Sequence, residues 1–338
     1  MTPAAAHHAA AVFCLIVVAS LTSCRSKGPT GSTPPEGLAP PIGIAFSVPS
    51  GELTFFELDD CQITGTYVLP GSWAVASAAI NVQGDRLIIA DDNGARIGLF
   101  KLPELTQLAA IPVGGVPMDM QLNTPGTHIF LVTQNSNFWI YAIAAQRFDT
   151  LETGALPRRL ALRPPEFLQA WVACGGSSSV SVFNLAVFQL ADTIPFPTPP
   201  TAVVFSPNGT LAYVARRGSP GWVDILDAAS RTVITSIEAG SGPFDFAVDG
   251  DGEILAATDS ARSNVRVWDL AHAQQWDVAI PSSPGRIRYS AGEDAFYVCS
   301  RQQGRVYKLQ VTLGAAQLTD SLWTVPWVRD VALWESTQ

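Results

Sequence analysis

The sequence predicts an all-β fold, a seven-bladed β-propeller of four-stranded blades, on three observations. First, similar segments begin at residues 75, 117, 157, 200, 243, 284 and 328, so a unit of 40–44 residues recurs through the chain. A β-rich repeat of this length is typical of propellers. Second, each complete unit contains four short runs of β character. Third, the last unit breaks off after its first run, and the first unit lacks that run.

The composition agrees with a turn-rich β protein. The 338 residues are 47% hydrophobic and only 14% charged, and they include 27 Gly and 25 Pro. So much Gly and Pro is unusual for a helical protein and ordinary for one with many tight turns. The formal net charge of −9 argues against a nucleic-acid partner, because binding phosphates requires clustered Lys and Arg.

The unit that begins at Pro200 shows the four expected strands in order. Apolar and polar residues alternate in the first and third runs, as half-buried strands require. A Pro-Asn-Gly turn joins the first two runs, and Gly and Pro lead into the next unit. The four runs are 202–206, 210–215, 221–227 and 231–239.

The two ends of the propeller complete one blade. Residues 43–48, 53–59 and 63–69 have the pattern of three strands, but the segment before them is rich in Pro, which cannot form an interior strand. The isolated run 328–334 supplies the missing strand. We therefore expect the C-terminal strand to pair with 43–48 and close the ring, which removes the open edges of the array.

The repeat resembles that of the YVTN-type β-propellers of surface-layer and lactonase-like proteins. The best copy runs from Pro200 to Arg216 and contains "FSPNGTLAYVAR", in which "YVAR" stands where the family has YVTN. "YVCS" (297–300) stands in the same place of a later unit. The resemblance covers residues 43–335 and implies the propeller fold. It also implies, by analogy alone, an alternative activity as a lactonase-like hydrolase.

The N-terminal segment is expected to lie outside the propeller. Residues 9–24 form an apolar run that is too short to span a membrane and suits a signal peptide. The run ends Leu21-Thr22-Ser23-Cys24, which resembles the lipobox of bacterial lipoproteins and implies cleavage before Cys24 and lipidation of its thiol. The alternative is an ordinary secretory signal with a chance Cys.

The expected domain organisation follows from these boundaries. Residues 1–23 form the lipoprotein signal peptide, 24–42 a flexible linker of Pro, Gly and Ser, and 43–338 the propeller. Arg25, rather than Asp, follows the lipidated Cys, and the sorting of lipoproteins in diderm bacteria then implies the outer membrane. The protein is expected in the cell envelope, facing the periplasm or the cell surface.

Motifs for catalysis, metal or haem are few. Cys61, Cys174 and Cys299 are odd in number, far apart in sequence and without a C-x-x-C pair, so buried packing is their expected role. His128 and His272 belong to different predicted blades, which argues against a shared metal or a catalytic triad. We expect neither a metal nor a cofactor.

One set of side chains is expected to line the top of the central channel. The first strand of each blade lines the axis of a propeller, and the loops between second and third strands share one face, called the top face. The residues two positions after each start point are Ser77, Asp119, Arg159, Ala202, Asp245, Arg286 and Asp330; Gln121 and Arg288 are polar members of the next set. They either pair as opposite charges round the ring or form a polar funnel for a ligand.

Arginines in the top-face loops of the last blades form a second candidate set. With Arg286 and Arg288 they are a candidate site for a carboxylate or phosphate group, because a guanidinium binds such anions through two parallel hydrogen bonds. The alternative is ordinary solvated loop charge. The loop residues are Arg216, Arg217, Arg262, Arg301 and Arg305.

The sequence favours a lipid-anchored, monomeric envelope protein that acts as a non-enzymatic binding or scaffold protein through its top face. Its partner would be an envelope protein or an anionic ligand, and the lipid would be its only contact with the membrane. Two alternatives stay open: a lactonase-like hydrolase and a cofactor-binding redox propeller. The hydrolase would have to use Asp119, Asp245 and Asp330 with Arg159 and Arg286.

Overall fold

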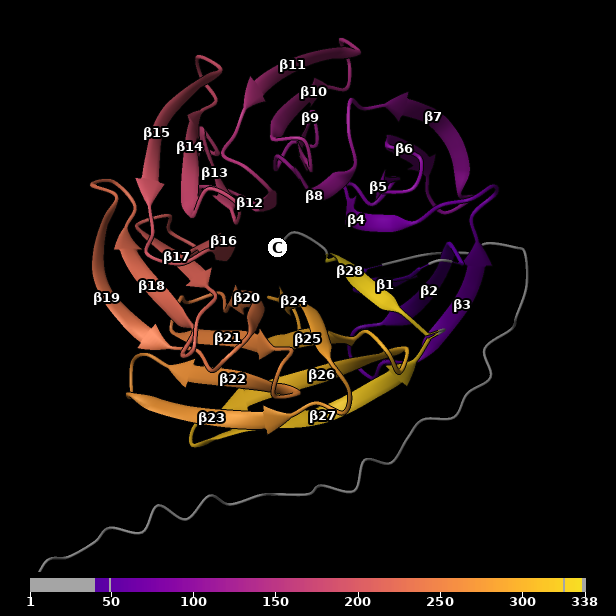
Figure 1. Cartoon of the computed structure of the whole chain (residues 1–338). Coiled ribbons are helices and arrows are strands. Elements are labelled where there is room, and N and C mark those ends of the chain that lie inside the picture. Colours follow the sequence, from indigo (N-terminus) through magenta and orange to yellow (C-terminus); the bar gives the residue numbers. More distant parts are fainter. Residues whose placement is uncertain (1–39, 49, 325, 336–338) are drawn as a thin grey trace, which may run out of the picture.

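The computed structural model describes residues 40–48, 50–324 and 326–335, which form 28 strands in seven four-stranded antiparallel sheets. The sheets stand round a central axis as the blades of a propeller (Figure 1). The predicted fold class and blade number are confirmed. The described residues contain no helix long and apolar enough to cross a membrane. The predicted signal peptide, Cys24 and nearly all of the predicted linker lie outside the described residues.

In each blade the strands follow one another in chain order from the axis outward, with β28 as the innermost strand of blade 1. Blade 1 contains β28 (Val328–Trp334), β1 (Ile42–Ser47), β2 (Glu52–Glu57) and β3 (Ile63–Val68). Blade 2 contains β4 (Val75–Ile80), β5 (Arg86–Asp91), β6 (Arg96–Lys101) and β7 (Thr106–Pro112). Blade 3 contains β8 (Pro117–Leu122), β9 (His128–Thr133), β10 (Asn137–Ala142) and β11 (Arg147–Glu152). Blade 4 contains β12 (Pro157–Leu162), β13 (Gln169–Cys174), β14 (Ser179–Asn184) and β15 (Gln189–Pro195).

The last three blades have the same order. Blade 5 contains β16 (Pro200–Phe205), β17 (Leu211–Arg216), β18 (Trp222–Asp227) and β19 (Thr232–Glu238). Blade 6 contains β20 (Pro243–Val248), β21 (Ile254–Asp259), β22 (Asn264–Asp269) and β23 (Gln274–Ala279). Blade 7 contains β24 (Pro284–Ser290), β25 (Ala295–Ser300), β26 (Arg305–Thr312) and β27 (Ala315–Trp323).

The first blade is closed by the two ends of the propeller, as the sequence predicts. β28 pairs antiparallel with β1, and the register places Phe46 opposite Asp330 and Ile44 opposite Ala332. β1 begins at Ile42, one residue before the expected strand. The ring is therefore joined by main-chain hydrogen bonds between the first and last strands that the structure describes.

The apolar core lies between neighbouring blades. Seven buried clusters each join the side chains of two adjacent sheets. Between blades 4 and 5, for example, Trp171 meets Phe205 edge to face with ring centroids 5.2 Å apart. Cys61, Cys174 and Cys299 are buried free thiols, which fits the packing role expected of them. Burial raises the pKa of the Cys61 thiol to about 12.

The innermost strands share one irregularity that shapes the axis. In β12, Pro157 pairs with Cys174 and Arg159 with Ala173, so Arg158 between them has no partner in the ladder. Each of the other six inner strands shows a corresponding shift of register at the same end. A bulge of this kind leaves the extra residue outside the ladder and redirects its side chain. The second residue of an inner strand can therefore face the top of the channel.

Candidate anion-binding site

Three aspartates and three arginines form a buried ion network on the axis. Arg286 Nη1 lies 2.6 Å from Asp119 Oδ1 and 3.3 Å from Asp330 Oδ2. Arg159 Nη1 lies 3.2 Å from the same oxygen of Asp119, and Arg159 also pairs with Asp245. These five side chains come from five different inner strands, so the network joins blades that are far apart in sequence.

Arg288 completes the balance of charge. Its Nη2 atom lies 2.9 Å from Asp330 Oδ2, and its Nη1 atom lies 3.6 Å from Asp245 Oδ2. Three carboxylates thus face three guanidinium groups. Desolvation raises the pKa of Asp245 and of Asp330, and the neighbouring arginines oppose that rise. Desolvation alone would lower the pKa of Arg288, but the carboxylates of Asp330 and Asp245 outweigh it and raise that pKa.

The other polar residues predicted along the axis have local partners. The Ser77 hydroxyl donates to Asp330 Oδ2 over 3.4 Å. The Gln121 amide donates to the Leu160 carbonyl over 3.0 Å and accepts from the Leu162 amide over 3.1 Å. Ala202, the apolar member of the predicted ring, is buried. These contacts tie inner strands together.

A cavity of about 180 Å³ lies above this network. Five of its lining residues are the bulged second residues of inner strands, and Arg159 and Arg286 of the network also reach it. Two more come from loops that directly follow second strands, so the cavity opens on the top face. The lining residues are Met118, Arg158, Arg159, Thr201, Arg217, Phe244, Arg286, Arg301 and Arg329.

The lining contains six arginines and no acidic side chain. Arg329 Nη1 pairs with Asp92 Oδ2 at 2.5 Å, and two others belong to the buried network. Among the described residues, no carboxylate forms an ion pair with the remaining three, which are Arg158, Arg217 and Arg301. The cavity therefore carries uncompensated positive charge, which favours an anionic ligand.

The pKa shifts of two lining arginines agree with the absence of carboxylate partners. Desolvation and the nearby Arg217 lower the pKa of Arg158. Desolvation and the nearby Arg329 lower the pKa of Arg301. In both cases the neighbouring charged group is another arginine and not a carboxylate. A bound anion would remove this repulsion.

Three of the five predicted loop arginines do not line the cavity. Arg216 makes a two-pronged ion pair with Asp224, at 2.6 and 3.2 Å. Arg262 stands 4.0 Å from Asp259 and remains half exposed. The Arg305 guanidinium lies 3.8 Å from the ring centroid of Trp323. The predicted site therefore does not gather all five loop arginines at one cavity, because these three lie against partners within their own blades.

Arg158 and Arg329 also line the cavity, although neither belongs to the predicted site. The start points of the repeat predict only the third residue of each inner strand at the channel. The bulge brings the second residue there as well. In the sequence, this second residue is the one directly after each start point. It is Arg in both of these units.

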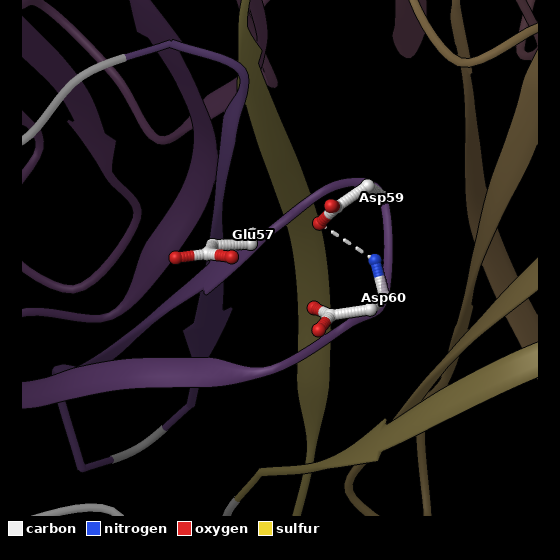
Figure 2. A group of neighbouring side chains, drawn as sticks. All are labelled: Glu57, Asp59 and Asp60. Atoms are coloured by element: carbon white, nitrogen blue, oxygen red, sulfur yellow. Dashed lines mark hydrogen bonds between the residues drawn. The ribbon is translucent and has the colours of Figure 1, made fainter.

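Three exposed carboxylates gather away from the axis, in the turn between β2 and β3. Ligand atoms of Glu57, Asp59 and Asp60 lie within 4.8 Å of one another (Figure 2). The Asp60 amide donates to Asp59 Oδ1 over 2.8 Å, and the Gln62 amide donates to Asp60 Oδ1 over 2.9 Å. Two of the three carboxylates thus already cap the turn.

The two histidines outside the predicted signal peptide stay apart, as their blades predict. His128 Nδ1 is hydrogen-bonded to the Thr127 hydroxyl at 2.9 Å in blade 3. His272 Nδ1 lies 2.8 Å from Asp269 Oδ2 in a turn of blade 6. Each therefore has a partner beside it in the sequence, and they form no joint site.

Comparison with known proteins identifies the fold. No family model and no curated protein matches the chain. Among solved structures, a functionally unknown protein from Desulfotomaculum acetoxidans DSM 771 is similar with a TM-score of 0.74 and 14% identity, over 88% of this chain and 100% of that one. Hydrazine synthase of Kuenenia stuttgartiensis is similar with a TM-score of 0.65 and 17% identity, over 72% of this chain and 77% of that one. At such identities the similarity establishes the shared propeller fold alone.

Proposed function

We propose that this protein is a non-enzymatic binding protein that captures an anionic group of a ligand or partner in the cavity of its top face. One observation carries the proposal: Arg158, Arg217 and Arg301 border a cavity without acidic side chains and have no carboxylate partner among the described residues. Guanidinium groups that converge on a concave site are suited to carboxylates and phosphates.

The hydrolase alternative has less support from the same geometry. Its three candidate carboxylates, Asp119, Asp245 and Asp330, are each held by two arginines in the buried network. The one hydroxyl of the cavity lining, that of Thr201, donates to the main-chain carbonyls of Ala215 and Pro243. Neither set offers a free base to activate water.

The proposal includes a place in the cell. The predicted signal peptide over 1–23 and the lipobox-like sequence that ends at Cys24 support a lipoprotein, held on the outer membrane by its lipid and facing the periplasm or the cell surface, and the proposal takes it as a monomer. The linker over 24–42 would hold the propeller away from the lipid. The YVTN-type repeat is consistent with an envelope protein, and the ligand would come from the same compartment.

Thermal denaturation with added anions tests the proposed binding. Inorganic phosphate and succinate are compared with chloride at equal ionic strength. An anion at about 100 times its Kd stabilises the native state by about 2.7 kcal/mol, or about 4 °C in Tm for a domain of roughly 300 residues. The double variant Arg158→Gln, Arg217→Gln should lose this shift.

The matched control is Arg147→Gln. Arg147 pairs with Asp149 on the exposed edge of blade 3, and its side chain is 70% exposed. This variant should keep the full shift. If neither anion shifts Tm, or if the double variant shifts as the unaltered chain does, the cavity is not an anion site.

A further inference from the structure

The arginines of the cavity stand in two pairs on opposite sides of the axis. The first pair is Arg158, the bulged residue of β12 in blade 4, and Arg217, which directly follows β17 in blade 5. The second pair is Arg301, which directly follows β25 in blade 7, and Arg329, the bulged residue of β28 in blade 1. β12 and β16 lie on one side of the axis in Figure 1, and β24 and β28 lie on the other.

Apolar side chains separate the two pairs. Phe244, the bulged residue of β20, enters the cavity from blade 6, and Met118, the bulged residue of β8, enters from blade 3. Blade 6 stands between the two pairs on one side of the ring. The Phe244 ring centroid lies 5.5 Å from the Arg301 guanidinium carbon. The cavity thus has two cationic ends, with Phe244 and Met118 between them above the charge-balanced Arg159 and Arg286.

The volume and the net charge of the cavity limit which anions it can bind. The volume of about 180 Å³ is below the roughly 300–1,000 Å³ of sites for drug-sized molecules. The two pairs carry four positive charges, and Asp92 on Arg329 offsets one, which leaves three. A dianion is neutralised in this site, whereas two phosphate groups at roughly −1.5 to −2 each would exceed its charge.

We propose that the cavity binds a short linear dicarboxylate, with one carboxylate on each arginine pair and the carbon chain between them against Phe244 and Met118. This inference rests on the proposed function and specifies its ligand. Each carboxylate can accept hydrogen bonds from two guanidinium groups. A compact anion of one centre, such as phosphate, reaches one pair only and leaves the other uncompensated.

Calorimetric titration with a series of ligands tests the assignment. Malonate, succinate, glutarate and adipate differ by one methylene each, and butyrate and inorganic phosphate serve as single-centre references at the same ionic strength. We expect one dicarboxylate length to bind at least 10-fold more tightly than butyrate and phosphate. Tight binding should weaken steeply with added salt, because Arg217 and Arg301 are exposed.

Single variants show whether both ends are used. Arg217→Gln and Arg301→Gln should each reduce the affinity for the best dicarboxylate to about that of butyrate and abolish the preference for length. Butyrate should lose affinity in at most one of the two variants. Arg217→Lys and Arg301→Lys keep the charge and provide folded alternatives if a Gln variant fails to fold, and each should weaken binding less than Gln. Arg147→Gln is again the control.

The outcomes separate the two proposals. If phosphate or butyrate binds as tightly as every dicarboxylate, or if only one arginine pair affects dicarboxylate binding, the two-ended ligand is wrong and anion binding stands. If no anion of the series binds, both proposals fail. A dicarboxylate optimum that survives both Gln variants would place the ligand outside this cavity and overturn the inference.

Discussion

Replacing Asp119 by Asn would break the buried network at a carboxylate that two arginines share. Asp119 Oδ1 accepts from Arg286 at 2.6 Å and from Arg159 at 3.2 Å, and its Oδ2 accepts from the Leu160 amide at 3.0 Å. The side chains of both arginines are at most 8% exposed. The Asn amide keeps the volume of the side chain but removes its charge, so one buried positive charge loses its counter-charge.

The expected loss of stability follows from the burial of the ion pairs that Asp119 makes. Removing one partner of a buried ion pair destabilises a protein by about 3–5 kcal/mol, because the remaining charge stays desolvated without compensation. An unfolding entropy of about 2.1 cal/mol/K per residue gives about 0.6 kcal/mol/K for roughly 300 residues. We therefore expect the Asp119→Asn variant to melt about 5–8 °C below the unaltered protein.

Calorimetry of three variants provides the test. Asp149→Asn removes the carboxylate of an exposed pair with Arg147 and should change the free energy of unfolding by less than about 1 kcal/mol. Combining Asp119→Asn with Arg286→Met restores the charge balance and should recover part of the loss, a non-additivity that reveals direct coupling. If Asp119→Asn melts with the unaltered protein, the network does not hold the inner strands together and the reasoning fails.

Four further changes test other parts of the molecule. Deletion from Val328 onward removes β28 and should leave an insoluble chain; a soluble product with unchanged Tm would contradict the closure. Cys24→Ala should abolish incorporation of labelled palmitate and partitioning into detergent, and partitioning that persists would exclude lipidation. Cys61, whose thiol has a pKa raised to about 12, should react with iodoacetamide at pH 8 only after unfolding, as mass spectrometry would show. Arg158→Gln without added anion should leave Tm unchanged or slightly raised, since it relieves repulsion from Arg217; a clear drop would make Arg158 structural.

The repeat made the number of blades and the first residue of each inner strand predictable from the sequence. All seven predicted start points are the first residues of the seven inner strands, because five of the seven starts are Pro, which has no amide hydrogen and is tolerated as the first residue of a strand. The closure was predictable for the same reason: an incomplete first unit and an isolated final strand add up to one blade. Neither inference needed any knowledge of side-chain contacts.

The candidate site was only partly predictable. Period alone placed Asp119, Asp245 and Asp330 at the axis, and the structure adds which arginine each one meets. The bulge after the first residue of the inner strands is a property of the backbone that the repeat pattern does not express. For this reason Arg158 and Arg329 were missed.

The second and third residues of an inner strand therefore have different roles. In β12, Arg159 pairs within the ladder and points into the buried network, where its charge is balanced and its loss would weaken the ring. Arg158 stands outside the ladder and borders the cavity without a carboxylate partner. The charge-balanced network thus joins inner strands under the cavity, while the arginines without carboxylate partners border the cavity above it. We therefore expect substitutions at the bulged positions to change the charge of the cavity without disturbing the ion network that joins the inner strands.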